Sequence, residues 1–178
     1  MTAGNKYWTY NSTSQFNCPT NGNCIFTIIA ADGAYNQNSS TTLTLTVDTL
    51  PPYVTNFDIN DTDKVVTSTA ILNFTVEVND SSGITSVTMN GTTMSGPTAG
   101  AITGIWSTVN STNQFSCPSN GVCIFTITAT DNVSNTNSST TLTITTDSGA
   151  PTVTNFGVND TDRIVKSSDS LNFSVQVS

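Results

Sequence analysis

The stretch Asn110-Ser-Thr-Asn-Gln-Phe-Ser-Cys117-Pro-Ser-Asn-Gly-Val-Cys123-Ile-Phe-Thr-Ile127 is the key to the fold, because nearly the same residues occur earlier as Asn11-Ser-Thr-Ser-Gln-Phe-Asn-Cys18-Pro-Thr-Asn-Gly-Asn-Cys24-Ile-Phe-Thr-Ile28. The two copies are offset by 117 − 18 = 99 positions. With that offset, about 60% of the positions between Tyr10 and Asn79 are identical to their counterparts in the later copy. The chain therefore carries an internal repeat of about 99 residues, which is the size of one β-sandwich domain.

The repeat is out of phase with the 178 residues of the sequence. We expect residues 1–47 to be the C-terminal half of one repeat, residues 48–147 a complete repeat, and residues 148–178 the N-terminal strands of a further repeat. The boundaries fall at Asp48-Thr-Leu-Pro-Pro52 and at Asp147-Ser-Gly-Ala-Pro151. Proline and glycine at these places favour short linkers between domains.

Alternating apolar and polar residues predict β-strands in the complete repeat. Tyr53–Ile59 is expected to form a first strand and Ala70–Val78 a second. The apolar face of the second strand would consist of Leu72, Phe74, Val76 and Val78. This alternation indicates that one face of the strand is buried.

Strand and turn signals continue to the end of the repeat. Asn90-Gly91 favours a two-residue hairpin turn between strands at 85–89 and 92–94. Further strands are expected at Ile105–Val109, Gln114–Cys117, Cys123–Thr130 and Thr140–Thr146. Because no helical period is present, the sequence predicts an all-β fold. Trp106 is expected in the core, and its counterpart is Trp8 if the earlier copy is one residue shorter before Asn11.

Composition argues against several classes of partner. Only 9% of the residues are charged, the formal net charge is -8, and the cations are Lys6, Lys64, Arg163 and Lys166. Four scattered cations cannot neutralise a run of phosphates, so we do not expect nucleic-acid binding. Without a run of about eighteen apolar residues or a charged-then-apolar leader, we expect neither a membrane span nor a signal peptide in this sequence.

The four cysteines form two pairs with identical spacing, and the sequence contains no His. Zinc sites usually need close cysteine pairs that converge on one ion. Here the two members of a pair are six positions apart and each pair lies in a different repeat, which favours the disulfides Cys18–Cys24 and Cys117–Cys123. Disulfides predict an oxidising, extracellular setting.

A family resemblance follows from the segments 80–91, 125–135 and 141–147 together with Trp106 and Pro151. These read Asp80-Ser-Ser-Gly-Ile-Thr-Ser-Val-Thr-Met-Asn-Gly91, Phe125-Thr-Ile-Thr-Ala-Thr-Asp131-Asn-Val-Ser-Asn135 and Thr141-Leu-Thr-Ile-Thr-Thr-Asp147. They resemble the tandem immunoglobulin-like repeats of prokaryotic surface adhesins, S-layer proteins and extracellular filament proteins. The resemblance implies tandem immunoglobulin-like β-sandwiches in this chain. The cysteine loop differs from the inter-sheet bridge of antibody domains.

Calcium is the metal for which the sequence offers ligands. Asn60-Asp-Thr-Asp63 and Asn159-Asp-Thr-Asp162 place carboxylates two residues apart near the linkers. Oxygen-rich clusters at domain junctions are what calcium requires. The candidate ligands are Asp48, Asp61, Asp63, Asp147, Asp160 and Asp162. The alternative is that these residues form solvated turns, where Asp is also common.

N-glycosylation is a further candidate modification. Asn-x-Ser/Thr sequons occur at Asn11, Asn38, Asn60, Asn73, Asn79, Asn90, Asn110, Asn132, Asn137, Asn159 and Asn172. Asn73 and Asn172 alternate with apolar residues, so their side chains are expected to point to solvent.

The sequence argues against an enzyme. Without His, nucleophile systems that pair Ser or Cys with His cannot form. Glu77 is the only glutamate, and its counterpart 99 residues later is Gln176.

The expected function is structural: a segment of a secreted filament, surface layer or adhesin stalk at the cell surface. The alternative is an adhesin binding module that recognises a glycan or a cell-surface protein. The expected partner is the chain itself, either as a homopolymer or within a long tandem array. Because residues 148–178 contain strands that residues 1–47 lack, one chain could complete the next by strand addition; alternatively, the sequence is a stretch of a longer chain.

Overall fold

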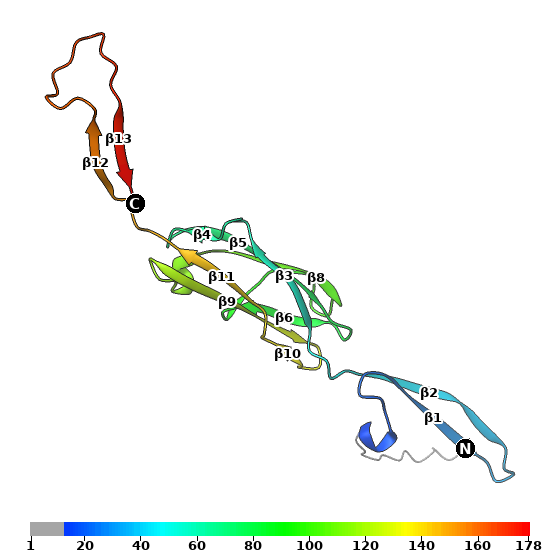
Figure 1. The fold of residues 1–178 in the computed structure, drawn as a ribbon. Coiled ribbons are helices and arrows are strands. Elements are labelled where there is room, and N and C mark those ends of the chain that lie inside the picture. The colour runs from blue at the N-terminus through cyan, green and yellow to red at the C-terminus, as the bar shows by residue number, and fades with distance from the viewer. Residues whose placement is uncertain (1–12) are drawn as a thin grey trace.

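The computed structural model describes residues 13–178, and these residues form an elongated molecule of β-strands (Figure 1). The first two strands lie at one end, the last two lie at the other end, and the strands between them form a central body. In chain order the elements are the short 3₁₀ helix η1 (Thr13–Phe16), β1 (Gly22–Ala31), β2 (Gln37–Val47), β3 (Tyr53–Ile59), β4 (Val65–Val66), β5 (Ile71–Asn79), β6 (Ile84–Met89), β7 (Thr92–Thr93), β8 (Thr103–Ser111), the 3₁₀ helix η2 (Thr112–Phe115), β9 (Gly121–Asp131), β10 (Thr136–Asn137), β11 (Thr141–Thr146), β12 (Val153–Val158) and β13 (Phe173–Val177).

Two sheets make up the central body. One has the strand order β3-β5-β8, and the other has the order β4-β11-β9-β6-β7, with β10 pairing with β9. The strands pair in antiparallel fashion except for β4 and β11, which are parallel. One hydrophobic core lies between the sheets and includes Phe74 and Trp106 from the first sheet and Phe125 and Ile127 from the second. The predicted all-β class is confirmed.

The alternating pattern of β5 explains how the first sheet buries one face. The four residues predicted to face the core are each at most 3% exposed: Leu72, Phe74, Val76 and Val78. Trp106 on the neighbouring strand β8 is 5% exposed, which confirms its predicted place in the core. Its counterpart Trp8 lies outside the described residues.

The hairpin between β6 and β7 forms at the predicted Asn90-Gly91 turn. Asn90 and Gly91 have φ angles of 46° and 81°, the left-handed values that a two-residue hairpin turn requires. The Asn90 side chain also joins the hairpin to β9, because its Oδ1 accepts the backbone N–H of Thr126 at 2.8 Å.

One predicted strand is wrong. The segment predicted as a strand at Gln114–Cys117 overlaps η2, a single 3₁₀ turn. The turn starts with a capping box, in which Gln114 Oε1 accepts the backbone N–H of Ser111 at 3.0 Å. It ends at Ser116, which adopts the left-handed conformation with φ of 57°. The ring of Phe115 packs against the core from this turn, so a strand is not needed to bury it.

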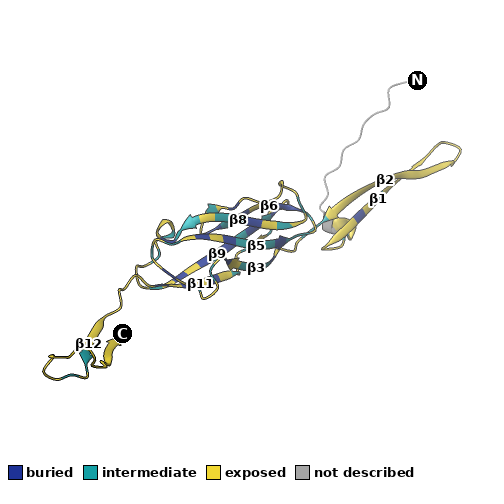
Figure 2. Ribbon diagram, turned by 90° about the horizontal axis from the view of Figure 1, so that it is seen from above, coloured by how far each residue is buried: buried dark blue, intermediate teal, exposed yellow. Residues whose placement is uncertain are grey.

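The strands β1 and β2 pair in the same register as β9 and β11. Gly22 pairs with Val47, and 99 residues later Gly121 pairs with Thr146. Among the described residues no second sheet covers β1 and β2, and nearly all of their residues are exposed (Figure 2). Cys24 is the buried residue of this pair of strands.

The strands β12 and β13 repeat the pairing of β3 and β5. Val153 pairs with Val177, and 99 residues earlier Val54 pairs with Val78. Most of β12 and all of β13 are exposed. The pairing thus recurs with the sequence repeat, whereas the boundaries predicted at residues 47/48 and 147/148 stay a prediction. None of the helices in the described residues is long and apolar enough to cross a membrane.

Candidate functional site

Both predicted disulfides are present in the structure. The Cα atoms are 5.1 Å apart in Cys18–Cys24 and 5.3 Å apart in Cys117–Cys123. Each bridge closes the loop that leads from a 3₁₀ turn into a long strand, η1 into β1 and η2 into β9. All four cysteines are paired, which is compatible with an oxidising environment.

The loop closed by Cys117–Cys123 is also tied to β11. Thr146 is 1% exposed, and its Oγ1 lies 2.7 Å from the carbonyl oxygen of Pro118 and 3.1 Å from that of Gly121. A buried hydroxyl needs such partners, because leaving it without one costs about 1–3 kcal/mol. The disulfide loop therefore forms part of the end of the central body at which the chain leaves toward β12.

The linker between β2 and β3, residues 48–52, is held by side chains of the central body. Asn135 Nδ2 donates to the carbonyl oxygen of Leu50 at 3.2 Å, and Asn137 Nδ2 donates to that of Pro52 at 2.8 Å. The side-chain amides thus satisfy backbone carbonyl oxygens of the linker that have no partner strand to bond to. The linker is fixed where it enters the body.

We call each connection between successive groups of strands, at residues 48–52 and 147–151, a joint. At each joint an asparagine from the preceding group of strands also binds the linker. Asn21 Oδ1 accepts the backbone N–H of Thr49 at 2.7 Å, and its counterpart Asn120 Oδ1 accepts that of Ser148 at 2.8 Å. The Ser148 hydroxyl also lies 2.9 Å from the hydroxyl of Ser68. The same contact therefore recurs at both joints, 99 residues apart.

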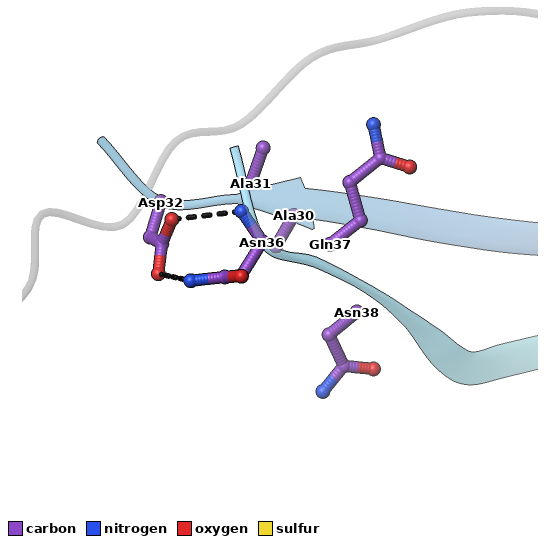
Figure 3. A pocket seen from close by; sticks show the side chains of 6 residues that line it. All are labelled: Ala30, Ala31, Asp32, Asn36, Gln37 and Asn38. Carbon is purple, nitrogen blue, oxygen red and sulfur yellow. Dashed lines mark hydrogen bonds between the residues drawn. The ribbon is translucent and has the colours of Figure 1, made fainter. Parts of the chain in front are cut away.

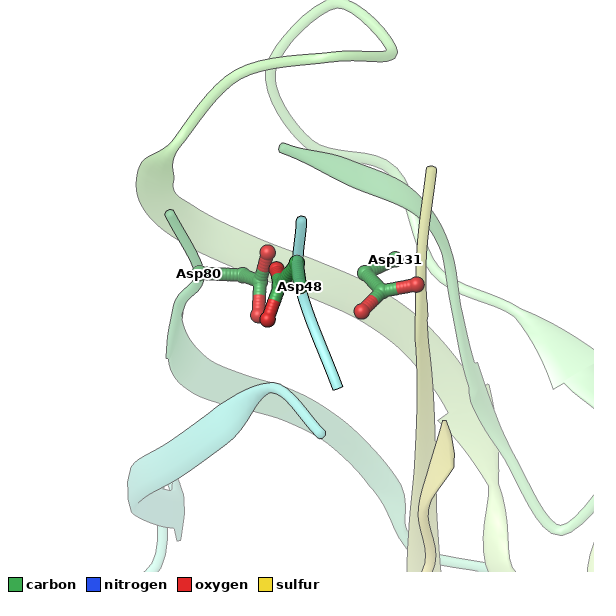
Figure 4. A group of neighbouring side chains, drawn as sticks. All are labelled: Asp48, Asp80 and Asp131. Atoms are coloured by element: carbon green, nitrogen blue, oxygen red, sulfur yellow. The ribbon is translucent and has the colours of Figure 1, made fainter. Parts of the chain in front are cut away.

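Three carboxylates meet where the linker of residues 48–52 enters the body. Asp48, Asp80 and Asp131 each place one oxygen within 4.8 Å of the others (Figure 4). Asp131 is 2% exposed, whereas Asp48 and Asp80 are half-buried. We call these three residues the acidic cluster. Negative charges so close together attract a cation, and carboxylate oxygens are the ligands that calcium prefers, so these residues could hold a divalent cation.

Hydrogen bonds orient the carboxylates of the acidic cluster. Asp131 Oδ1 accepts the backbone N–H of Val133 at 2.9 Å and that of Asn135 at 2.8 Å. Asp131 Oδ2 accepts the side-chain amide of Asn135 at 2.8 Å. Asp48 Oδ1 accepts the backbone N–H of Leu50 at 3.0 Å, and this bond holds the pKa of Asp48 below its usual value.

Of the six residues predicted to bind calcium, only Asp48 lies in the acidic cluster; the others are Asp61, Asp63, Asp147, Asp160 and Asp162. Asp61 Oδ1 accepts the N–H of Lys64 at 2.8 Å, and Asp63 Oδ1 accepts that of Val65 at 3.0 Å. Asp160 and Asp162 repeat both bonds. These bonds to backbone amides lower the pKa of Asp63 and Asp162. The residues cap turns, and calcium binding by this chain stays a prediction.

A hollow at the far end of β1 and β2 repeats the hydrogen bonds that surround Asp131 (Figure 3). Asp32 Oδ1 accepts the backbone N–H groups of Ala34 and Asn36, each at 2.9 Å, and Oδ2 accepts the Asn36 side chain at 2.9 Å. These bonds, the side-chain bond foremost, lower the pKa of Asp32. Asp131, Val133 and Asn135 form the same arrangement 99 residues later. We call the hollow the notch; its lining residues are Ala30, Ala31, Asp32, Asn36, Gln37 and Asn38.

Ten of the eleven sequons lie in the described residues, at Asn38, Asn60, Asn73, Asn79, Asn90, Asn110, Asn132, Asn137, Asn159 and Asn172, whereas Asn11 lies outside them. Asn73 and Asn172 are exposed, which confirms their predicted orientation toward solvent. Asn132 Nδ2 instead donates to the carbonyl oxygen of Ser82 at 2.8 Å, and Asn137 Nδ2 donates to that of Pro52. The side-chain nitrogens of Asn132 and Asn137 are thus engaged in bonds to the protein, which makes these two sequons less suited to carry a glycan. Glycan occupancy stays a prediction.

A scan against protein-family models finds no match for this chain, and a search of curated proteins finds none either.

Proposed function

We propose that this chain is a structural segment of a secreted filament, surface layer or adhesin stalk, built from immunoglobulin-like β-sandwich repeats of about 99 residues. The observation that carries the proposal is the recurring joint. Asn21 and Asn120, 99 residues apart, each hold the first residue after a linker carboxylate. A joint that recurs with the repeat gives each unit the same connection to the next, as an extended array requires.

Three further features support a role outside the cell. The disulfides recur with the 99-residue offset, and disulfides persist mainly in oxidising compartments. Sequons with exposed side chains offer sites for glycans. The acidic composition, with a net charge of -8, favours a solvated surface.

Localisation tests the proposal. Antibodies against the chain are used for immunogold electron microscopy of the cells that produce it. We expect the label outside the cytoplasmic membrane, along filaments or along a continuous surface layer. Thiol titration of protein extracted without reductant is expected to find all four cysteines oxidised. Label confined to the cytoplasm, or free thiols in the extracted protein, would contradict the proposed function.

A further inference from the structure

The dipeptide Asn-Gly occurs three times in the sequence, and all three copies lie in the described residues. In this dipeptide the backbone nitrogen of glycine can attack the side-chain amide carbon of asparagine, because glycine has no Cβ to hinder the approach. Asparagine therefore loses its amide most readily before glycine, and the contacts of the side chain decide how fast. The three copies are Asn21-Gly22, Asn90-Gly91 and Asn120-Gly121.

Two of these asparagines are the ones that bind the linkers at the joints. Asn21 Oδ1 accepts the backbone N–H of Thr49 at 2.7 Å and the hydroxyl of Thr49 at 3.1 Å. Asn120 Oδ1 accepts the backbone N–H of Ser148 at 2.8 Å. Attack at the amide carbon moves negative charge onto Oδ1, and donors that already point at this oxygen stabilise the charge. The contact that forms each joint therefore also favours the attack.

The nitrogen that would leave is unrestrained at both joints. Nδ2 of Asn21 and Nδ2 of Asn120 donate to no atom of the described residues, so each amide is held through Oδ1 alone. Both side chains are exposed, so water reaches them. Each amide is thus free to turn about Oδ1 toward the nitrogen of the glycine that follows.

Asn90 also precedes a glycine, but its amide is held at both ends. Its Oδ1 accepts the backbone N–H of Thr126 at 2.8 Å, and its Nδ2 donates to the carbonyl oxygen of Ile124 at 3.2 Å. Both partners lie on β9, so the plane of the amide is fixed against this strand. Loss of this amide requires the bond from Nδ2 to break first. The hairpin therefore protects its Asn-Gly pair, whereas the joints leave theirs open.

We propose that Asn21 and Asn120 are sites of spontaneous deamidation, so that each joint gains a negative charge as the protein ages. The backbone nitrogen of Gly22 or Gly121 bonds to the amide carbon of the preceding asparagine. The bond from this carbon to Nδ2 breaks, and Nδ2 leaves as ammonia with the proton that the glycine nitrogen gives up. Water then opens the resulting cyclic imide at one of its two carbonyl carbons, which gives aspartate or isoaspartate. Water is the only co-reactant, and no atom is oxidised or reduced.

The new charge would lie beside a carboxylate that is already present. Asn120 Oδ1 and Asp147 Oδ1 are both next to Gly149, at 4.0 Å and 3.2 Å from the position that a Cβ atom on this glycine would occupy. Carboxylates at both positions repel each other. Isoaspartate also adds a methylene carbon to the main chain, so its carboxylate no longer lies where Oδ1 accepted the N–H of Ser148. Deamidation therefore weakens the joint.

Peptide mapping of the aged protein tests the inference. The full chain is kept folded in mildly alkaline buffer, which removes the proton from the attacking nitrogen more readily. Mass spectrometry follows the replacement of the amide by an acid at positions 21, 90 and 120. We expect Asn21 and Asn120 to deamidate at least about five times faster than Asn90, the factor that corresponds to one additional hydrogen bond. Ion-exchange chromatography is expected to show more acidic forms of the chain at the same rate.

The unfolded chain is the control for the effect of neighbouring residues. The chain is reduced and unfolded in urea, where none of the three asparagines keeps its contacts. We expect the three positions to deamidate at similar rates under these conditions. The same order of rates in the folded and the unfolded chain would assign the difference to the local sequence and overturn the role of the contacts.

Thr49→Val tests the donors at Oδ1. The change removes the hydroxyl that donates to Asn21 and leaves the backbone N–H in place. Because Thr49 is exposed, the fold is expected to persist, and circular dichroism checks this. We expect the rate at Asn21 to fall, while the rate at Asn120 in the same molecule stays unchanged and serves as the internal control. An unchanged or higher rate at Asn21 overturns the stabilising role of the joint contact.

Two results in the folded wild-type chain overturn the inference as a whole. One is deamidation at Asn90 that is as fast as at Asn21 and Asn120. The other is the absence of deamidation at the two joints under conditions in which the unfolded chain deamidates. The inference goes beyond the proposed function and is separable from it: a chain at the cell surface that keeps its amides defeats only this inference, and a cytoplasmic chain defeats only the proposed function.

Discussion

Phe74 shows how one residue connects three elements of the central body. It lies on β5, and its ring is 4.7 Å from that of Phe125 on β9 and 5.8 Å from that of Phe115 in η2. The side chain is completely buried. Such aromatic contacts add to the stabilisation that comes from buried area alone. Phe74 therefore couples the two sheets and anchors the turn that precedes the disulfide loop.

Replacement of Phe74 by Ala is expected to lower the free energy of unfolding of the central body by about 3–5 kcal/mol, because the cavity would lie between two sheets that cannot close over it. Urea unfolding measures the loss through the fluorescence of Trp106, in a background where Trp8 is replaced by Phe. Asn73→Ala, at the neighbouring exposed position, is the control and is expected to change stability by less than about 0.5 kcal/mol. A loss below about 1 kcal/mol for Phe74→Ala would contradict the packing described above.

At the scale of the elements, the long strands were predictable because their alternation is local. Residues 71–79 carry their period in the sequence itself, and Asn90-Gly91 marks its hairpin by backbone chemistry. The segment at Gln114 was mispredicted because Phe115 and Cys117 suggest a strand, although the capping box Ser111-x-x-Gln114 was visible. The strand β4 was missed since two residues carry no period, and only its pairing with β11 defines it.

The two disulfides are expected to differ in their effect on the central body. Loss of Cys117–Cys123 through Cys→Ser changes at both positions should lower its free energy of unfolding by about 2 kcal/mol, because the bridge closes a short loop in the unfolded chain. The same changes at Cys18 and Cys24 are the matched control, since this bridge lies at β1 and does not contact the core of the central body. The measurement is urea unfolding followed by Trp106 fluorescence in the Trp8→Phe background. Equal losses for the two pairs would contradict this assignment.

At the scale of the whole molecule, the repeat predicted the succession of similar units but not the contacts made at their joints. The acidic cluster combines Asp80 and Asp131, which are 131 − 80 = 51 positions apart, with Asp48 from the linker. No local pattern relates these residues, and only the packing of the strands brings them together. The sequence prediction included Asp48, which lies in the cluster, but it combined Asp48 with carboxylates such as Asp61 and Asp63, which bond to their own turns.

The joint between β2 and the central body is expected to loosen when its asparagines are removed. Asn135→Ala together with Asn137→Ala removes the side-chain bonds to Leu50 and Pro52, each of which contributes about 1 kcal/mol. Small-angle X-ray scattering of a dilution series should show a broader distribution of long distances. Ser138→Ala, at an exposed position between β10 and β11, is the control. An unchanged distribution in the double variant would show that Asn135 and Asn137 do not hold the joint and that other contacts, such as that of Asn21 with Thr49, are sufficient.

The shared register of β1-β2 and β9-β11 has a consequence for how such a chain can change in length. Equivalent positions 99 residues apart make the same strand pairings, and the equivalent residues Asn21 and Asn120 each bind the linker that follows. A DNA crossover between two copies of the repeat, misaligned by one period, joins the first part of one unit to the second part of another. Every strand of the hybrid unit still meets a partner of the kind it had before. The length of the chain could therefore change in whole units, without mutation having to produce a new core or a new linker contact.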